Sequence, residues 1–213
     1  MRGALVALTT ALGVAGSLTA GIGGRAVQSQ ATLRFAGIVR QQDDHTCGYA
    51  AAATVLQSMG LAADERSLLA HLDSRGAGRG ATLGGIGRVT AHWGVESFAV
   101  RSTWEHLVAY FVRYDEPVLG LVNPDRPHFT VILYADAWGV YLADPSLGYL
   151  VLDPGRFAER WTGVLLFLRP PDGFGLQSRQ IALALERMHS RHHALLRTQA
   201  GLHLMTRARG ARW

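Results

Sequence analysis

Residues 40–56, RQQDDHTCGYAAAATVL, decide how this chain folds. In this segment a polar loop runs into an alanine-rich stretch that ends at Gly60, and glycine is the residue that most often follows a helix. The chain's one cysteine, Cys47, begins the predicted helix. A thiol at that place faces unpaired backbone N–H groups and the positive end of the helix dipole, which favour the thiolate. A lone cysteine is more often an inert core residue, so its chemistry has to be argued from other parts of the chain.

The hydrophobic pattern changes from helical to strand-like along the chain. Residues 64–72 and 103–111 predict two more helices, the second capped by Thr103, and the glycine-rich residues 76–87 predict a loop that leads into a helix near Thr82. Short β-branched or aromatic runs separated by Pro, Gly, Asp and Asn follow at 117–122, 129–134, 140–143, 149–152 and 164–168. Helices first and strands later predict an α+β domain, with N-terminal helices packed on a C-terminal antiparallel sheet.

Composition divides the chain into three parts. Residues 1–27 begin with Arg2 and continue through an apolar stretch that has no further charge until Arg25. That pattern predicts a cleaved export signal, with an uncleaved N-terminal anchor as the second reading and a buried helix as the third. Residues 30–172 hold the predicted domain, which is therefore expected outside the cytoplasm, in the periplasm or anchored to a membrane.

Residues 177–213 predict a separate, helical and basic tail. They carry seven arginines against one glutamate, a formal charge of +6, whereas the whole chain carries +5. A basic tail on a nearly neutral domain indicates a local surface, in contact with anionic lipid or a partner or simply solvated, and does not indicate a nucleic-acid-binding protein. The histidines of the tail that could bind a metal are His189, His192, His193 and His203. Although His189 and His193 share a helix face, the pattern supplies no carboxylate to orient them, so we expect no metal site.

Two absences exclude whole classes of chemistry. The chain contains no lysine, which excludes a Walker-type nucleotide site and a lysine Schiff base. Its single cysteine excludes an intramolecular disulfide and a multi-cysteine metal site. We therefore expect a reaction that uses protein side chains alone, without a cofactor.

The strand half of the chain supplies partners for Cys47. His128 opens the run HFTVILY and Asp144 ends the run VYLAD, and the turn at residues 136–139 joins the two. Counted back from that turn, both residues lie about one strand length away, so antiparallel pairing predicts contact between the imidazole and the carboxylate. Asp144 would then fix the tautomer of His128 and stabilise its protonated form. Gln41, six residues before Cys47, can donate its side-chain amide to an oxyanion beside the Cys47 N–H.

Each of these residues has a rival or a simpler explanation. His45 is too close to Cys47 in sequence to orient as its base, and Gln42 is one residue out of place for the oxyanion donor. Asp153, which precedes a proline, competes with Asp144 but fits a turn better. His128 alone would be read as a surface residue at the end of a strand, so only the combination predicts chemistry.

Three segments in order resemble one known family. RQQDDHTCGYAAAATVL, HFTVIL followed by VYLADPSLG, and the later Phe157 and Trp161 resemble the double-glycine leader peptidases, papain-like domains that process bacteriocin precursors at the front of their ABC exporters. The likeness covers residues 36–168, and the gaps of 81 residues from Cys47 to His128 and of 16 from His128 to Asp144 are typical of the family. In architecture the chain is similar to standalone, exported members, some of which are encoded with extracellular amyloid secretion machinery.

The resemblance implies a papain-like cysteine peptidase with Cys47 as nucleophile, His128 as base, Asp144 as the orienting residue and Gln41 as oxyanion donor. It implies a peptide substrate with small residues such as Gly-Gly at the cleavage site, and a role beside a secretion-system partner. Thr46 and Tyr49 replace an acidic residue and a proline that are common in exporter-linked members, which predicts an altered substrate groove. Two alternatives stay open: a catalytically silent module that delivers a peptide segment to a secretion channel, and a cell-wall cysteine amidase.

Overall fold

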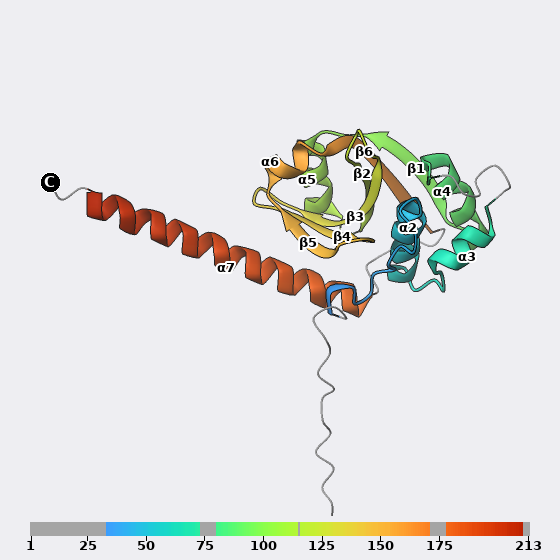
Figure 1. The fold of residues 1–213 in the computed structure, drawn as a ribbon, viewed down its shortest axis with the longest axis horizontal. Helices are drawn as coiled ribbons and strands as arrows, with labels where there is room; N and C mark the ends of the chain where they lie inside the picture. The colour runs from blue at the N-terminus through green and yellow to red at the C-terminus, as the bar shows by residue number, and fades with distance from the viewer. Residues whose placement is uncertain (1–32, 73–79, 115, 171–177, 211–213) are drawn as a thin grey trace, which may run out of the picture.

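The computed structural model describes residues 33–72, 80–114, 116–170 and 178–210 (Figure 1). The signal or anchor predicted over residues 1–27 lies outside these ranges, as does part of the glycine-rich stretch. Among the described residues, the structure contains no helix with the length and apolar character needed to span a membrane.

The alanine-rich stretch forms the central helix, α2 (Cys47–Ser58), and the helix begins at Cys47 as predicted. Ala50, Ala51, Ala52 and Ala53 are completely buried, and their small side chains allow the helix to pack closely on strand β3 (His128–Ala135). The Thr54 hydroxyl donates to the Ala50 carbonyl at 2.9 Å and accepts the Val39 N–H at 2.9 Å. The helix is thereby joined to the segment that leads into the polar loop.

The other helices around the sheet are short, and their N-terminal caps explain where they begin. They are α3 (Glu65–Ala70), α4 (Leu83–Thr90), the 3₁₀ turn η1 (Ala91–Trp93), α5 (Trp104–Arg113) and α6 (Pro154–Ala158). Asp64, Thr82, Thr103 and Asp153 each accept a backbone N–H from the first turn of the helix that follows. The predictions at Thr82 and Thr103 are confirmed, and Asp153 has the helix-capping role that suits an Asp-Pro pair.

Six strands form one antiparallel sheet in the order β1-β6-β2-β3-β4-β5. They are β1 (Glu96–Arg101), β2 (Val118–Val122), β3 (His128–Ala135), β4 (Val140–Asp144), β5 (Gly148–Leu152) and β6 (Trp161–Arg169). The last five correspond to the five predicted runs, whereas the edge strand β1 was missed. The α+β class with an antiparallel sheet is confirmed.

Helices cover both faces of the sheet, which explains why its central strands are almost continuously apolar. Successive side chains of β3 alternate between the faces. Val131 and Leu133 pack in the core that contains Val55 of α2, whereas Ile132 packs in the core that contains Leu107 of α5. The predicted packing of the N-terminal helices on the sheet therefore holds for α2, but α5 lies with α6 on the opposite face (Figure 1).

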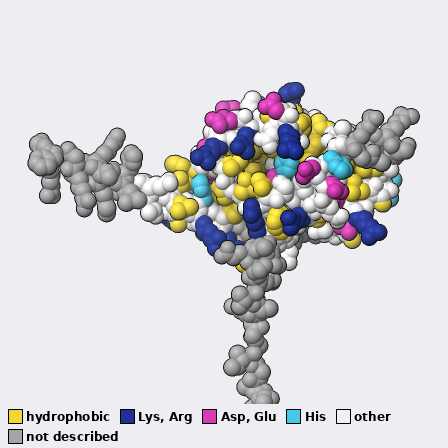
Figure 2. All heavy atoms as spheres, viewed as in Figure 1, with side chains coloured by type: hydrophobic (Ala, Val, Ile, Leu, Met, Phe, Trp, Pro, Cys, Tyr) yellow, Lys and Arg dark blue, Asp and Glu magenta, His cyan; other side chains and the backbone are white. Residues whose placement is uncertain are grey.

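The C-terminal segment forms the long helix α7 (Arg179–Gly210), whose first part packs on the domain. Ile181 and Ala184 are buried, and Ile181 belongs to the same core as α2. The expectation of a separate tail is therefore wrong for this part, because apolar residues at helical spacing bind it beside β4 and β5. Farther along, α7 extends away from the domain (Figure 1). On the face shown in Figure 2, arginines are interspersed with acidic and hydrophobic side chains and form no single continuous basic surface.

Gly48, directly after the cysteine, shows how closely α2 approaches its neighbours. A Cβ added there would lie 2.4 Å from Ala81 Cβ, and 2.9 Å from both Ile86 Cδ1 and Phe129 Cδ2. Replacing Gly48 with alanine is expected to lower the free energy of unfolding by about 1–3 kcal/mol, the usual cost of overpacking a core. Urea or thermal unfolding measures the change.

Gly84→Ala is the matched control for this prediction. An added Cβ at Gly84, in α4, meets only Arg88 Nη1, at 3.5 Å. This substitution is expected to leave the stability unchanged or to raise it by up to about 1 kcal/mol, since alanine favours a helix. A Gly48→Ala protein as stable as the Gly84→Ala protein would contradict the close approach.

Candidate active site

Three elements bring Cys47, His128 and Asp144 together. Cys47 is the first residue of α2, His128 the first of β3 and Asp144 the last of β4. The β3–β4 hairpin closes with a hydrogen bond from the Asp136 N–H to the Gly139 carbonyl at 3.0 Å. At the other end of the hairpin, His128 Nε2 lies 2.8 Å from Asp144 Oδ2. The contact predicted by counting back from the turn is present.

The Asp144 carboxylate is fixed by its own turn. Its Oδ1 accepts hydrogen bonds from the Ser146 N–H at 2.9 Å, the Ser146 hydroxyl at 2.8 Å and the Leu147 N–H at 2.9 Å. Burial raises the pKa of Asp144, but the hydrogen bonds from His128 and Ser146 outweigh that effect and lower the pKa overall. The carboxylate is therefore ionised, and only its Oδ2 is directed at the histidine ring.

Cys47 and His128 favour the ionised form of each other. The Cys47 Sγ accepts the Phe129 N–H at 3.5 Å, and the residue is only 5% exposed. Burial raises the pKa of the thiol, but hydrogen bonds with His128 and with the N–H groups of Phe129 and Gly48 lower it overall. Burial lowers the pKa of His128, whereas hydrogen bonds to Asp144 and Cys47 raise it to about 9. Together these shifts favour the thiolate–imidazolium form of the pair over the neutral form.

Alkylation of Cys47 by a small reagent such as iodoacetamide is expected to rise with pH in two steps. The first step should lie below the ordinary thiol range, because the pKa of Cys47 is lowered. The second should lie near pH 9, where His128 loses its proton and no longer shields the thiolate. Mass spectrometry of the alkylated chain against pH measures both steps, with N-acetylcysteine as the reference thiol. A single step near the unperturbed value of about 8.5 would exclude the ion pair.

Gln41 lies in the wall of a cavity of about 300 Å³ that is also lined by His128 and Asp144. Its backbone N–H donates to the Pro145 carbonyl at 3.1 Å, which places it against the turn that holds Asp144. Its side-chain Nε2 donates to the Asp43 carbonyl at 3.0 Å. An amide has a second N–H, so this arrangement leaves one donor for another acceptor.

The rival residues lie elsewhere. His45 is exposed on the loop, and the Gln42 N–H donates to the Glu65 carboxylate at 3.1 and 3.2 Å. Thr46 and Tyr49, expected to alter a substrate groove, are each only 2% exposed. Because both side chains pack inside the domain, they can shape a groove only through packing, and the expectation stays a prediction.

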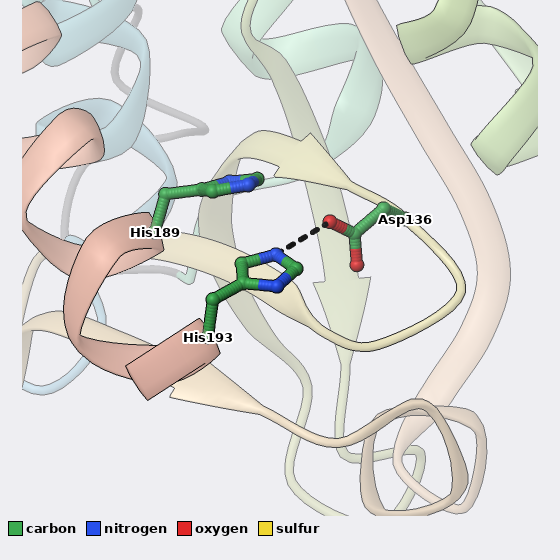
Figure 3. Close-up of side chains that lie close together, drawn as sticks. All are labelled: Asp136, His189 and His193. Atoms are coloured by element: carbon green, nitrogen blue, oxygen red, sulfur yellow. Dashed lines mark ion pairs between the residues drawn. The ribbon is translucent and has the colours of Figure 1, made fainter. Parts of the chain in front are cut away.

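A second group of polar side chains comes together where the sequence predicted no metal site. Asp136, at the β3–β4 turn, approaches His189 and His193 of α7 (Figure 3), so the assumption that no carboxylate orients these histidines is wrong. Burial and the neighbouring His193 lower the pKa of His189, against an opposite effect of Asp136. The spacing of four residues between the histidines was visible in the sequence, but the packing of α7 on the hairpin was not.

Comparisons with known proteins identify the family of the chain. The model of the peptidase C39 family matches residues 36–173. An uncharacterized protein of Methanothermobacter marburgensis is 34% identical over 135 residues, 61% of this chain and 85% of that protein. A protein named "Probable functional amyloid protease FapD", from Pseudomonas aeruginosa, is 30% identical over 146 residues, 65% of this chain and 63% of that protein.

Two solved structures share the fold. The peptidase domain of Streptococcus ComA, a bifunctional ABC transporter, has a TM-score of 0.54 at 23% identity, over 64% of this chain and 98% of that domain. A double-glycine-motif protease of an AMS/PCAT transporter, solved in complex with its leader peptide, has a TM-score of 0.52 at 20% identity, over 62% of this chain and 90% of that one. With the family match spanning more than half of its residues, the chain belongs to the peptidase C39 family and has its papain-like fold.

Proposed function

We propose that this chain is a cysteine endopeptidase that cleaves peptides after small residues of the Gly-Gly type. One observation carries the proposal: His128 Nε2 lies 2.8 Å from Asp144 Oδ2, and the same histidine lowers the pKa of the Cys47 thiol at the start of α2. A buried thiol with a lowered pKa beside an oriented imidazole is the arrangement that nucleophilic catalysis by cysteine needs. Membership of a peptidase family supports the same reaction.

In this mechanism each ring nitrogen of His128 has its own role. Because Nε2 faces Asp144, Nδ1 is the nitrogen that exchanges a proton with Cys47. The thiolate attacks the scissile carbonyl carbon, and the carbonyl electron pair moves onto the oxygen. As this tetrahedral intermediate collapses, the C–N bond breaks and Nδ1–H gives its proton to the leaving amine, which leaves a thioester on Cys47.

Hydrolysis of the thioester restores the starting pair. Neutral His128 takes a proton from a water molecule as that water attacks the thioester carbonyl. The C–S bond then breaks, the carboxyl product leaves, and the thiolate and imidazolium are regenerated. In both steps the oxyanion accepts hydrogen bonds from the Cys47 N–H, which the helix leaves without an intrahelical partner, and from the second N–H of Gln41.

The burial of Cys47 supports small residues at the cleavage site. With only 5% of Cys47 exposed, the scissile carbonyl has to come deep into the site to reach the sulfur. Side chains on either side of that bond would meet the walls, and glycine or alanine would not. The solved protease with a bound leader peptide is described as a double-glycine-motif protease, which agrees with this reasoning.

Replacing Gln41 with alanine is expected to lower kcat by about 10²–10³-fold with little change in KM, because an oxyanion donor acts mainly in the transition state. Gln42→Ala is the control, since the Gln42 side chain is exposed, and it should leave kcat unchanged. Steady-state kinetics on a cleaved peptide measures both. Equal rates for Gln41→Ala and the parent would remove Gln41 from the mechanism.

The proposal is tested by incubating the full chain with matched peptides that carry Gly-Gly or Leu-Leu at one central position, and with muropeptides. Mass spectrometry is expected to show cleavage after Gly-Gly alone, and loss of that cleavage after Cys47 is alkylated. Binding of the Gly-Gly peptide without cleavage would indicate the silent delivery module instead. Hydrolysis of the muropeptides alone would indicate the cell-wall amidase.

The proposal includes export to the periplasm and an accessory role in secretion. Residues 1–27 support export by their charge pattern. The relative from Pseudomonas aeruginosa is named as a functional amyloid protease, which supports a secreted substrate and a secretion-system partner. N-terminal sequencing of the protein from periplasmic and membrane fractions tests export. A full-length chain recovered from the cytoplasm would contradict it.

A further inference from the structure

The face of α7 that touches the domain changes character along the helix. Its more buried positions recur every three or four residues: Ile181, Ala184, Leu185, Met188, His189, His192 and His193. The first four are apolar and the last three are histidines. Of the next seven residues, six are exposed, so the histidines lie where the helix leaves the domain. At that place imidazole side chains, which can bind metals, take over from the apolar side chains that pack on the domain.

The β3–β4 turn presents a fixed carboxylate to these histidines. Asp136 Oδ1 accepts the Trp138 and Gly139 N–H groups, each at 2.8 Å. These two hydrogen bonds leave Oδ2 directed at His193 Nε2, 3.8 Å away (Figure 3). His192 Nε2 lies 3.0 Å from the Trp138 carbonyl and joins the helix to the same turn. Carboxylates that bind metals are usually held in place by hydrogen bonds to their other oxygen, as Asp136 is here.

The two histidine rings converge on that carboxylate. They are stacked with centroids 4.4 Å apart, and His189 also stacks on Tyr141 at 5.2 Å. His193 Nε2 is enclosed and has no hydrogen-bond partner among the described residues. One donor atom from each of His189, His193 and Asp136 lies within 4.8 Å of the other two. Around a tetrahedral zinc ion such atoms would be about 3.4 Å apart, so the side chains have to rotate to close the site.

We propose that Asp136, His189 and His193 bind one divalent transition-metal ion, best matched by Zn²⁺, with water as the fourth ligand. Two imidazoles and one carboxylate suit zinc, whereas calcium and magnesium prefer oxygen ligands alone. The ion connects α7 to the β3–β4 hairpin, whose opposite end carries His128 and Asp144. Its role is to fix the direction in which the rest of α7 leaves the domain.

Zinc binding is tested by equilibrium dialysis of the untagged full chain in a Cys47→Ser background, which prevents zinc from binding to the thiol beside His128. One zinc ion per chain is expected, together with a rise in Tm when zinc is added, because a ligand that binds only the folded state stabilises it. Asp136→Asn and His193→Ala are each expected to weaken binding by at least about 100-fold, since even residues behind a ligand are worth 10–100-fold.

Control variants distinguish zinc binding at this site from loss of folding and from zinc binding at another histidine pair. Asparagine at position 136 still has an oxygen to accept the two turn N–H groups, so a loss of zinc binding there is not a loss of folding; circular dichroism of each variant confirms the fold. His92→Ala is the control, because His92 stacks on His71 at 4.0 Å and forms the rival histidine pair. It should bind zinc as the parent does. Absence of zinc from the parent, undiminished binding by His193→Ala, or loss of binding in His92→Ala would each overturn the proposal.

Discussion

Replacing Cys47 with serine is expected to reduce peptide hydrolysis by at least about 10⁴-fold, the scale of loss when a nucleophile is removed from a catalytic triad. The reason lies in the pKa values of the pair. The lowered pKa of Cys47 and the raised pKa of His128 favour a proton on the ring before substrate arrives. A serine hydroxyl has no comparable ionised form, so the pair would have to move that proton during the attack, at the cost of a higher barrier.

Serine differs from cysteine by one atom, which keeps the packing around the start of α2 nearly intact. The variant should therefore unfold at nearly the same Tm as the parent, and its circular dichroism should match. Kinetics on the cleaved peptide, with parent protein alkylated at Cys47 alongside, measure the loss. A Cys47→Ser protein that cleaves the peptide at a rate close to that of the parent would show that the sulfur is not the nucleophile.

Replacing Asp144 with asparagine is expected to lower kcat by up to about 10⁴-fold, the loss observed when the histidine of a triad is held in the wrong tautomer. Asp144 Oδ1 already accepts three hydrogen bonds from Ser146 and Leu147. An asparagine oxygen would keep these three donors, and its NH₂ would then face His128 Nε2. His128 Nε2 would have to accept a hydrogen bond from that NH₂, which leaves the ring proton on Nδ1. A protonated Nδ1 cannot take a proton from Cys47.

Asp153→Asn is the matched control, because Asp153 also precedes a proline but caps α6. Asparagine caps a helix as well as aspartate does, so this variant should keep both its stability and its kcat. The pH profile of Cys47 alkylation gives an independent reading of Asp144→Asn, whose first step should move toward the ordinary thiol range. Unchanged kcat and an unchanged profile would mean that Asp144 only shapes the turn.

The site could be largely predicted from the sequence because its geometry is local to one hairpin and one helix terminus. Gly60 and the alanine run give the length of α2, and the turn at residues 136–139 brings the outer ends of β3 and β4 side by side, although a bulge between Ile132 and Tyr134 shifts their register. His128 and Asp144 could therefore be placed near each other, though not directly opposite, by counting. The hydrogen bonds from Ser146 to the second oxygen of Asp144 could not be foreseen, because the sequence around Ser146 predicts only a turn.

The features that were missed depend on contacts between distant segments. Strand β1 is exposed along most of its length, so it lacks the alternation that marks a strand, and its pairing with β6 defines it. The charge of α7 concealed its apolar face, since its six arginines outnumber the four apolar residues that pack on the domain, Ile181, Ala184, Leu185 and Met188. Asp136 is a turn residue in the sequence, and it meets His193 only because α7 folds back onto the hairpin.

Helix α7 continues well beyond the part that packs on the domain. Seventeen residues, Ala194–Gly210, follow the last histidine that contacts the β3–β4 turn. At a rise of 1.5 Å per residue they extend the helix by about 26 Å. A molecule bound at that end is thereby held about 26 Å along the helix from the β3–β4 turn.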